Sequence, residues 1–188
     1  MDISKALHRV EKRLNVTPKV VQTDTHNKYS KSTIYNWWGG SNIKANDAVE
    51  VSKAIKDFAT ANDLASQFFG IFRMLDGDKF KEDALSVEAF AEFEEQEKVD
   101  AFSKYHVRKL LASSDLTHAE QKDLYDSACE LLDSLLMNYK LLVLICEEQH
   151  IDLWDVYKER RKYYINAGYV EPERKEKLWM RRQSQSMD

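Results

Sequence analysis

The residues best suited to chemistry lie between positions 30 and 38, in the run SKSTIYNWW. Hydroxyl, amide and amine side chains are concentrated there, and they can bond to phosphates and base edges. Two apolar residues three positions apart, Ile34 and Trp37, can anchor the same helix to a core. This combination is typical of a helix that reads double-stranded DNA. The residues predicted to contact DNA are Ser30, Lys31, Ser32, Thr33, Tyr35 and Asn36.

A second candidate for chemistry is a set of carboxylates spaced three residues apart, Glu92 with Glu95 and Glu130 with Asp133. Side chains at this spacing share one face of a helix, and paired carboxylates can hold Mg²⁺. The pattern resembles the paired carboxylate helices of nucleotide pyrophosphohydrolases, so a magnesium-dependent enzyme is an alternative. The surrounding run EFEEQE is also typical of a solvated helix face.

No other arrangement of reactive side chains points to catalysis. The five histidines are scattered, and the two cysteines, Cys129 and Cys146, lie in one strongly helical stretch where small buried residues are expected. None of these residues has the spacing of a zinc site, and the sequence has no glycine-rich phosphate loop. We therefore predict no metal, no cofactor and no enzymatic activity.

The composition favours an all-α protein. Hydrophobic residues make up 43% of the 188 residues, and only five glycines and two prolines are present to interrupt helices. The longest apolar run, residues 131–146, is too short and too polar to span a bilayer. The N-terminus lacks an apolar segment of the signal-peptide type, and two isolated cysteines suit a reducing compartment. We expect a cytoplasmic protein with no membrane partner.

Four short helices are expected to position residues 30–38. Apolar residues at helical spacing mark the first and fourth helices, while a Thr-Pro pair marks the start of the second. The expected helices cover residues 3–14, a short stretch from Pro18, residues 30–38 and a stretch to Phe58 capped by Asn46, with a turn at 22–29. A further short helix is expected over residues 63–75.

The run YSKSTIYNWWGGSNIKANDAVEVSKAI resembles the second half of phage repressor helix-turn-helix domains, which have the lambda-repressor-like fold. The wider layout is similar to the phage regulatory protein CII family, whose members are DNA-binding oligomers. This resemblance implies a sequence-specific transcriptional regulator of phage or mobile-element origin. The segment before residue 30 departs from the family pattern, because it lacks the usual glycine and is about three residues longer.

In the second half of the chain, the pattern of apolar and capping residues predicts long helices. One long or kinked helix is expected over residues 85–112, and a second from Thr117, where Glu120 completes a capping box, to about His150. A third is expected from about Leu153 to Gly168. Two heptad rows on the second helix predict a homo-oligomer, a dimer or tetramer. The predicted oligomer interface consists of Leu124, Leu131, Leu135, Asn138, Leu142 and Ile145.

Asn138 has two interpretations. A single polar residue in an apolar seam can fix the register and the oligomeric state by pairing with its copy. Alternatively, the side chain lies on the outer face of its helix.

Charge and composition divide the chain into regions. Residues 1–57 carry a net charge of +4, residues 58–157 carry −12 and residues 158–188 carry +4. We predict a helix-turn-helix DNA-binding domain at 1–60, a connecting helix and linker at 61–80, a helical oligomerisation or partner-binding region at 81–170 and a charged tail at 171–188. The acidic middle leaves a further alternative, an interaction or inhibitor protein that competes with nucleic acid for a basic partner.

Overall fold

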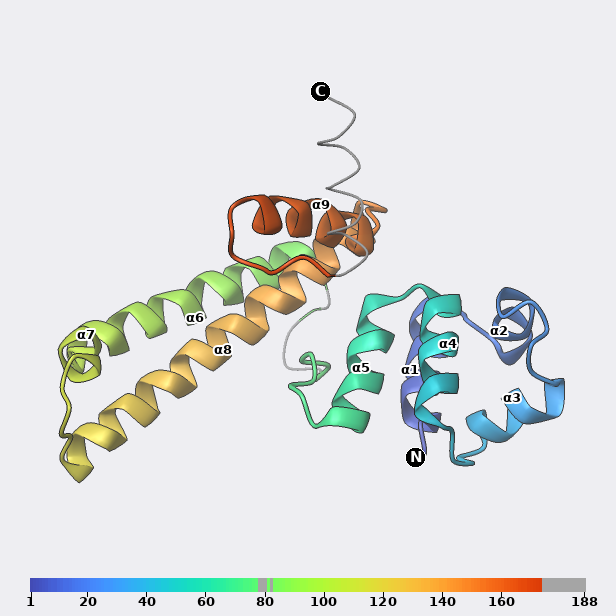
Figure 1. The fold of residues 1–188 in the computed structure, drawn as a ribbon, viewed down its shortest axis with the longest axis horizontal. Helices are drawn as coiled ribbons and strands as arrows, with labels where there is room; N and C mark the ends of the chain where they lie inside the picture. Colours follow the sequence, from blue (N-terminus) through green and yellow to red (C-terminus); the bar gives the residue numbers. More distant parts are fainter. Residues whose placement is uncertain (78–80, 82, 174–188) are drawn as a thin grey trace, which may run out of the picture. The chain divides into compact units, whose positions relative to one another are not determined.

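The computed structural model describes residues 1–77, 81 and 83–173. These residues form an all-α protein without a strand, as predicted, and Asp2 and Asn42 form one isolated β-bridge. The helices are α1 (Ser4–Leu14), α2 (Pro18–Asp24), α3 (Lys31–Trp38), α4 (Ala45–Ile55), α5 (Phe58–Phe69), α6 (Ala84–Lys104), α7 (Val107–Leu111), α8 (His118–Glu148) and α9 (Leu153–Asn166). Figure 1 shows their order along the chain.

The chain divides into two compact units, residues 1–145 and residues 146–188. The predicted linker at 61–80 includes residues 78–80, which lie outside the described residues, as does the predicted tail from residue 174. Among the described helices, none combines the length and apolar character needed to cross a bilayer.

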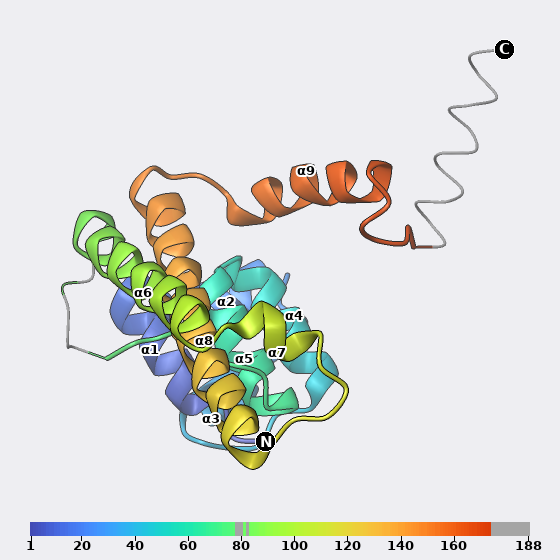
Figure 2. The same cartoon turned by 90° about the vertical axis from the view of Figure 1, so that its left-hand side faces the viewer.

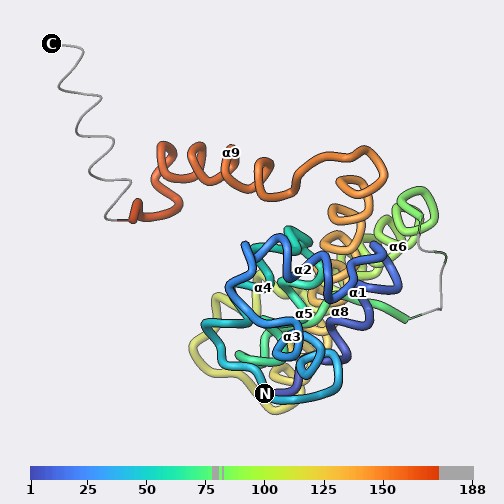
Figure 3. Tube along the Cα trace, turned by 90° about the vertical axis from the view of Figure 1, so that its right-hand side faces the viewer, coloured from blue at the N-terminus to red at the C-terminus, as the bar shows by residue number. Residues whose placement is uncertain are grey.

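Helices α1 to α5 surround one hydrophobic core. Helix α1 contacts α3 and α5, and α2 contacts α3 and α4, so that the five helices close around a shared interior. The buried core residues are Ile3, Ala6, Leu7, Val21, Ile34, Trp37, Trp38, Ile43, Ala48, Val51 and Leu64. The amide of Ile43 donates to the carbonyl of Met1 (2.9 Å), which places the N-terminus beside the loop after α3 (Figure 3).

The predicted ends of the fourth and fifth helices are wrong. Helix α4 ends at Ile55 because Lys56 adopts the left-handed conformation (φ 54°). Asp57 then caps α5, since its carboxylate accepts the amide of Thr60 (2.7 Å) and also pairs with Arg13 of α1. Helix α5 therefore covers 58–69 instead of 63–75.

Asn46 is not the cap of α4. The residue before the helix is Lys44, which has no side-chain capping bond, and Asn46 lies inside the first turn. Helix α4 is instead placed by the burial of Ala48 and Val51 against the core.

Helices α6 and α8 lie side by side and antiparallel, joined through α7 (Figures 1 and 2). The predicted helix over 85–112 is interrupted at His106, whose left-handed conformation (φ 51°) separates α6 from α7. The capping box before α8 is confirmed, because Thr117 N donates to Glu120 Oε2 (2.8 Å) and Glu120 N donates to Thr117 Oγ1 (3.3 Å). The buried core of this hairpin is small, with Val87, Ala91 and Met137.

The second unit contains α9. Its start at Leu153 is as predicted, and the Asp152 carboxylate caps it by accepting the amide of Trp154 (2.8 Å). Gly168 follows the end of α9 in the left-handed region (φ 79°), as expected of a glycine that stops a helix.

Candidate nucleic-acid interface

One side of α3 is fixed in the hydrophobic core. Ile34 and Trp37 are buried, which confirms that these two residues anchor the helix. Trp38 is also buried, and its indole Nε1 donates to Glu11 Oε2 of α1 (2.9 Å). The apolar spacing of three residues predicted only Ile34 and Trp37, so Trp38 is a third anchor that was not predicted. Helix α3 is therefore held by apolar packing and by a hydrogen bond to α1.

The opposite side of α3 is open. Lys31, Ser32, Tyr35 and Asn36 are all exposed, and their spacing places them together on one face of the helix. The Lys31 ammonium lies 5.5 Å from the centre of the Tyr35 ring, within the range of a cation–π contact. This face presents an amine, a hydroxyl, a phenol and an amide, which together can donate to and accept from a polar ligand.

Ser30 and Thr33 are used by the helix itself. Ser30 Oγ accepts the amide of Thr33 (3.1 Å), and the two side-chain oxygens lie 2.8 Å apart. Ser30 is therefore the N-cap, as predicted, and Thr33 is half-buried beside it. Of the six residues predicted to contact DNA, the structure gathers four on the open face and assigns two to the start of the helix.

The connection between α2 and α3 is shorter than predicted, because residues 22–24 belong to α2. Six residues, 25–30, join the two helices. His26 (φ 52°) and Asn27 (φ 56°) adopt the left-handed conformation that glycine adopts most easily. Asn and His are among the residues that tolerate this region best. The turn therefore forms without the glycine of the phage repressor pattern.

Tyr29 joins the turn to both neighbouring helices. Its hydroxyl donates to Asp47 Oδ1 of α4 (2.9 Å), and its ring packs at 70° to the Trp37 ring, with the ring centres 4.9 Å apart. Burial, followed by the bond to Asp47, raises the pKa of Tyr29 to about 12. Tyr29 lies in the predicted turn at 22–29, for which no role was predicted. The only available signal was an aromatic residue in a polar segment.

The segment around α3 is basic. Residues 16–44 contain four lysines and one aspartate. Lys19, Lys28, Lys31 and Lys44 are all exposed, although Lys28 lies 3.4 Å from Glu50 of α4. Cationic side chains beside an open polar helix face are suited to an anionic polymer, because they neutralise backbone phosphates.

The predicted oligomer interface lies along one face of α8. Leu131, Leu135, Leu142 and Ile145 are 40–57% exposed, Asn138 is exposed and Leu124 is half-buried. The Asn138 amide nitrogen donates to the carbonyl of Ser134 in its own helix (2.9 Å). These residues are apart from the small core of the α6–α8 hairpin.

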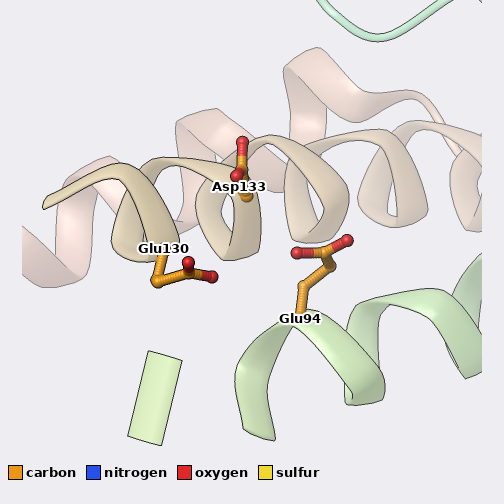
Figure 4. Close-up of side chains that lie close together, drawn as sticks. All are labelled: Glu94, Glu130 and Asp133. Carbon is orange, nitrogen blue, oxygen red and sulfur yellow. The ribbon is translucent and has the colours of Figure 1, made fainter. Parts of the chain in front are cut away.

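Acidic side chains do gather between α6 and α8, but the set differs from the predicted one. Glu94, Glu130 and Asp133 can place one carboxylate oxygen each within 4.8 Å of one another (Figure 4). Glu92 is exposed, and Glu95 instead accepts from Ser134 Oγ (2.8 Å) and pairs with Lys98, whose hydrogen bond lowers the pKa of Glu95. Spacing alone could not tell which glutamate of the run EFEEQE lies beside Glu130 and Asp133.

Models of known protein families, curated proteins and solved structures were all compared with the chain, and none of them matches it.

Proposed function

We propose that this chain is a sequence-specific DNA-binding transcriptional regulator of the phage type. The observation that carries the proposal is the division of α3 into a buried apolar side and an open polar side. Helices α2 and α3 would form the helix-turn-helix of a lambda-repressor-like domain. In such a unit, the second helix lies in the major groove and the first crosses the backbone.

Each exposed side chain of α3 has a role that suits its chemistry. Asn36 can donate to and accept from adenine, while Lys31 can bond to guanine or a phosphate. Ser32 and Tyr35 can contact bases or phosphates through their hydroxyl groups. Lys19 of α2 and Lys28 of the turn are suited to backbone phosphates, because both are exposed near α3 in the sequence.

The regulator would act as an oligomer and by occupancy of its operator. One α3 offers few base contacts, whereas two copies of the α1 to α5 domain related by two-fold symmetry can occupy half-sites about 34 Å apart. The gain in affinity then comes from the second domain being held close to its half-site after the first has bound.

The direct test measures binding to the intergenic DNA beside the coding sequence, by gel shift at two salt concentrations. The wild type should bind, and its affinity should fall as salt rises because counterions are released. The Lys31→Ala/Asn36→Ala variant should lose the preference for that DNA. Lys12→Ala is the control, since Lys12 is an exposed lysine of α1, away from α3 in the sequence. Equal binding by wild type and double variant would overturn the assignment of α3.

Two alternative functions make different predictions, one for DNA binding and one for nucleotide turnover. An acidic interaction or inhibitor protein predicts no DNA binding even at low salt. A magnesium-dependent nucleotide pyrophosphohydrolase predicts nucleotide turnover that Glu130→Ala abolishes.

A further inference from the structure

The face of α8 that points away from its buried contacts is an uninterrupted seam. The α8 seam consists of Leu124, Ala128, Leu131, Leu135, Asn138, Leu142 and Ile145. Consecutive members alternate between spacings of four and three residues, which is the a/d repeat of a coiled coil. At 3.6 residues per turn, all seven lie within an arc of about 100°.

The seam is separate from the faces of α8 that are already covered. Met137 packs with Val87 and Ala91 of α6, and Ser134 donates to Glu95 of the same helix. Lys140 is buried, and its ammonium donates to the carbonyl of Leu75 (2.8 Å). The seam residues take no part in these contacts, and six of the seven are exposed.

We infer that the α8 seam binds the same seam of a second copy of this chain, forming a homodimer. This extends the oligomer of the proposed function by naming its interface. A two-fold dimer needs a surface that is complementary to itself. A heptad seam satisfies this condition, because each a/d side chain fits between residues of a helix with the same repeat.

The distribution of charge favours a second copy over a basic or acidic partner. Between residues 124 and 145, the charged side chains are Asp126, Glu130, Asp133 and Lys140. At 100° per residue, all four lie more than about 100° from the centre of the seam. Two copies can therefore meet along it without opposing like charges, although residues 58–157 carry a net charge of −12.

The α8 seam is also large enough to be an apolar binding patch. It is about 32 Å long, from the helical rise over 21 residues, and about 10 Å wide. Its area of roughly 300 Å² falls in the range of the largest apolar patch on a soluble monomer, which is often functional. Asn138 lies within this patch and would fix the register of the pair at a cost in stability.

The test is the mass of the full chain in solution, measured by size-exclusion chromatography with light scattering and without DNA. The wild type should have twice the 22.0 kDa of one chain. Leu135→Glu/Leu142→Glu should elute at 22.0 kDa with unchanged helical circular dichroism. The matched control is Leu85→Glu/Leu111→Glu, which places the same charges on exposed leucines outside α8 (80% and 72% exposed) and should remain dimeric.

A second variant decides the result if the glutamates unfold the helix. Asn138→Leu keeps the seam apolar and should lower the dimer Kd about tenfold, by the burial of two leucines in place of two amides. A monomeric wild type, a dimeric Leu135→Glu/Leu142→Glu chain, or an unchanged Kd for Asn138→Leu would each overturn the inference. Because no DNA is present, failure of the dimer and failure of DNA binding are distinguished.

Discussion

The head formed by α1 to α5 and the hairpin formed by α6 and α8 differ in how much of their apolar surface they bury. The head has eleven buried residues in one cluster, whereas the hairpin cluster has three. On the hairpin, large apolar side chains such as Leu131 and Leu135 remain about half exposed. Burial of apolar surface is the main stabilising contribution to folding. The head is therefore stabilised by its own interior, while the hairpin leaves an apolar face of α8 exposed.

Polar contacts between helices occur in both regions, since Ser134 of α8 donates to Glu95 of α6 (2.8 Å). In the head, polar contacts join helices, as in the bond from Trp38 to Glu11 and the pair of Arg13 with Asp57. On α8, the amide of Asn138 bonds within its own helix. Polar bonds between helices fix their relative positions, so that the bond from Trp38 to Glu11 helps to fix which face of α3 is exposed.

The largest expected effect is the difference between two leucine truncations. Leu7→Ala removes a fully buried side chain of the head and should lower the free energy of unfolding by about 3 kcal/mol. Leu135→Ala, where the side chain is 57% exposed, should cost less than about 1 kcal/mol in the monomer. Urea unfolding at a protein concentration low enough to keep the chain monomeric would measure both. Equal losses would contradict the contrast between head and hairpin.

Structural features that depend on residues close together in the sequence could be predicted in both the head and the hairpin. The buried side of α3, its Ser30 cap and the capping box of α8 follow from side chains within one turn of each other. The heptad spacing likewise selected residues of α8 that the structure leaves open. These features are local because helical spacing determines which side chains share a face.

Features that depend on tertiary contact could not be predicted. The break between α4 and α5 occurs at Lys56, which adopts the left-handed conformation although it is not a glycine. The break is stabilised by the pairing of Asp57 with Arg13, which is distant in the sequence. Tyr29 bonds to Asp47 of α4, and Glu94 lies beside carboxylates of α8. Both α4 and α8 are far from these residues in the sequence. Their partners become visible only when the helices are assembled.

A smaller effect is expected from the turn of the head. His26→Gly should raise the free energy of unfolding by about 0.5 to 1 kcal/mol, because glycine adopts the observed φ of 52° without the steric penalty. Thr23→Gly, inside α2, should lower it by about 0.5 to 1 kcal/mol. Thermal unfolding followed by circular dichroism would measure both variants. Destabilisation by His26→Gly would show that the imidazole contributes more than its backbone conformation costs.

The last comparison concerns the alkaline titration of two tyrosines, one in each region. Burial is the main cause that raises the pKa of Tyr29 in the head and of Tyr139 in α8, each to about 12 from an ordinary value of 10. A group whose pKa is raised on folding contributes stability that is complete below its unfolded pKa and is lost as pH rises through the folded pKa. The stability that both tyrosines contribute should therefore be lost progressively between about pH 10 and pH 12.

Comparing single phenylalanine variants across that pH range separates the two regions. Tyr29→Phe should reduce the alkaline loss of stability and also cost about 1 kcal/mol at neutral pH, because Asp47 loses its hydrogen bond. Tyr139→Phe should also reduce the alkaline loss of stability, and it should cost less than Tyr29→Phe at neutral pH, because the hydrogen bond that it removes joins Tyr139 to the neutral amide of Asn62 and the ring contact with Phe58 (5.6 Å) is kept. Denaturation midpoints across this range would measure both. A wild type whose stability does not change over this interval would show that neither hydroxyl is shielded from water, and the packing of α3 against the turn would then be looser than the Tyr29–Trp37 contact indicates.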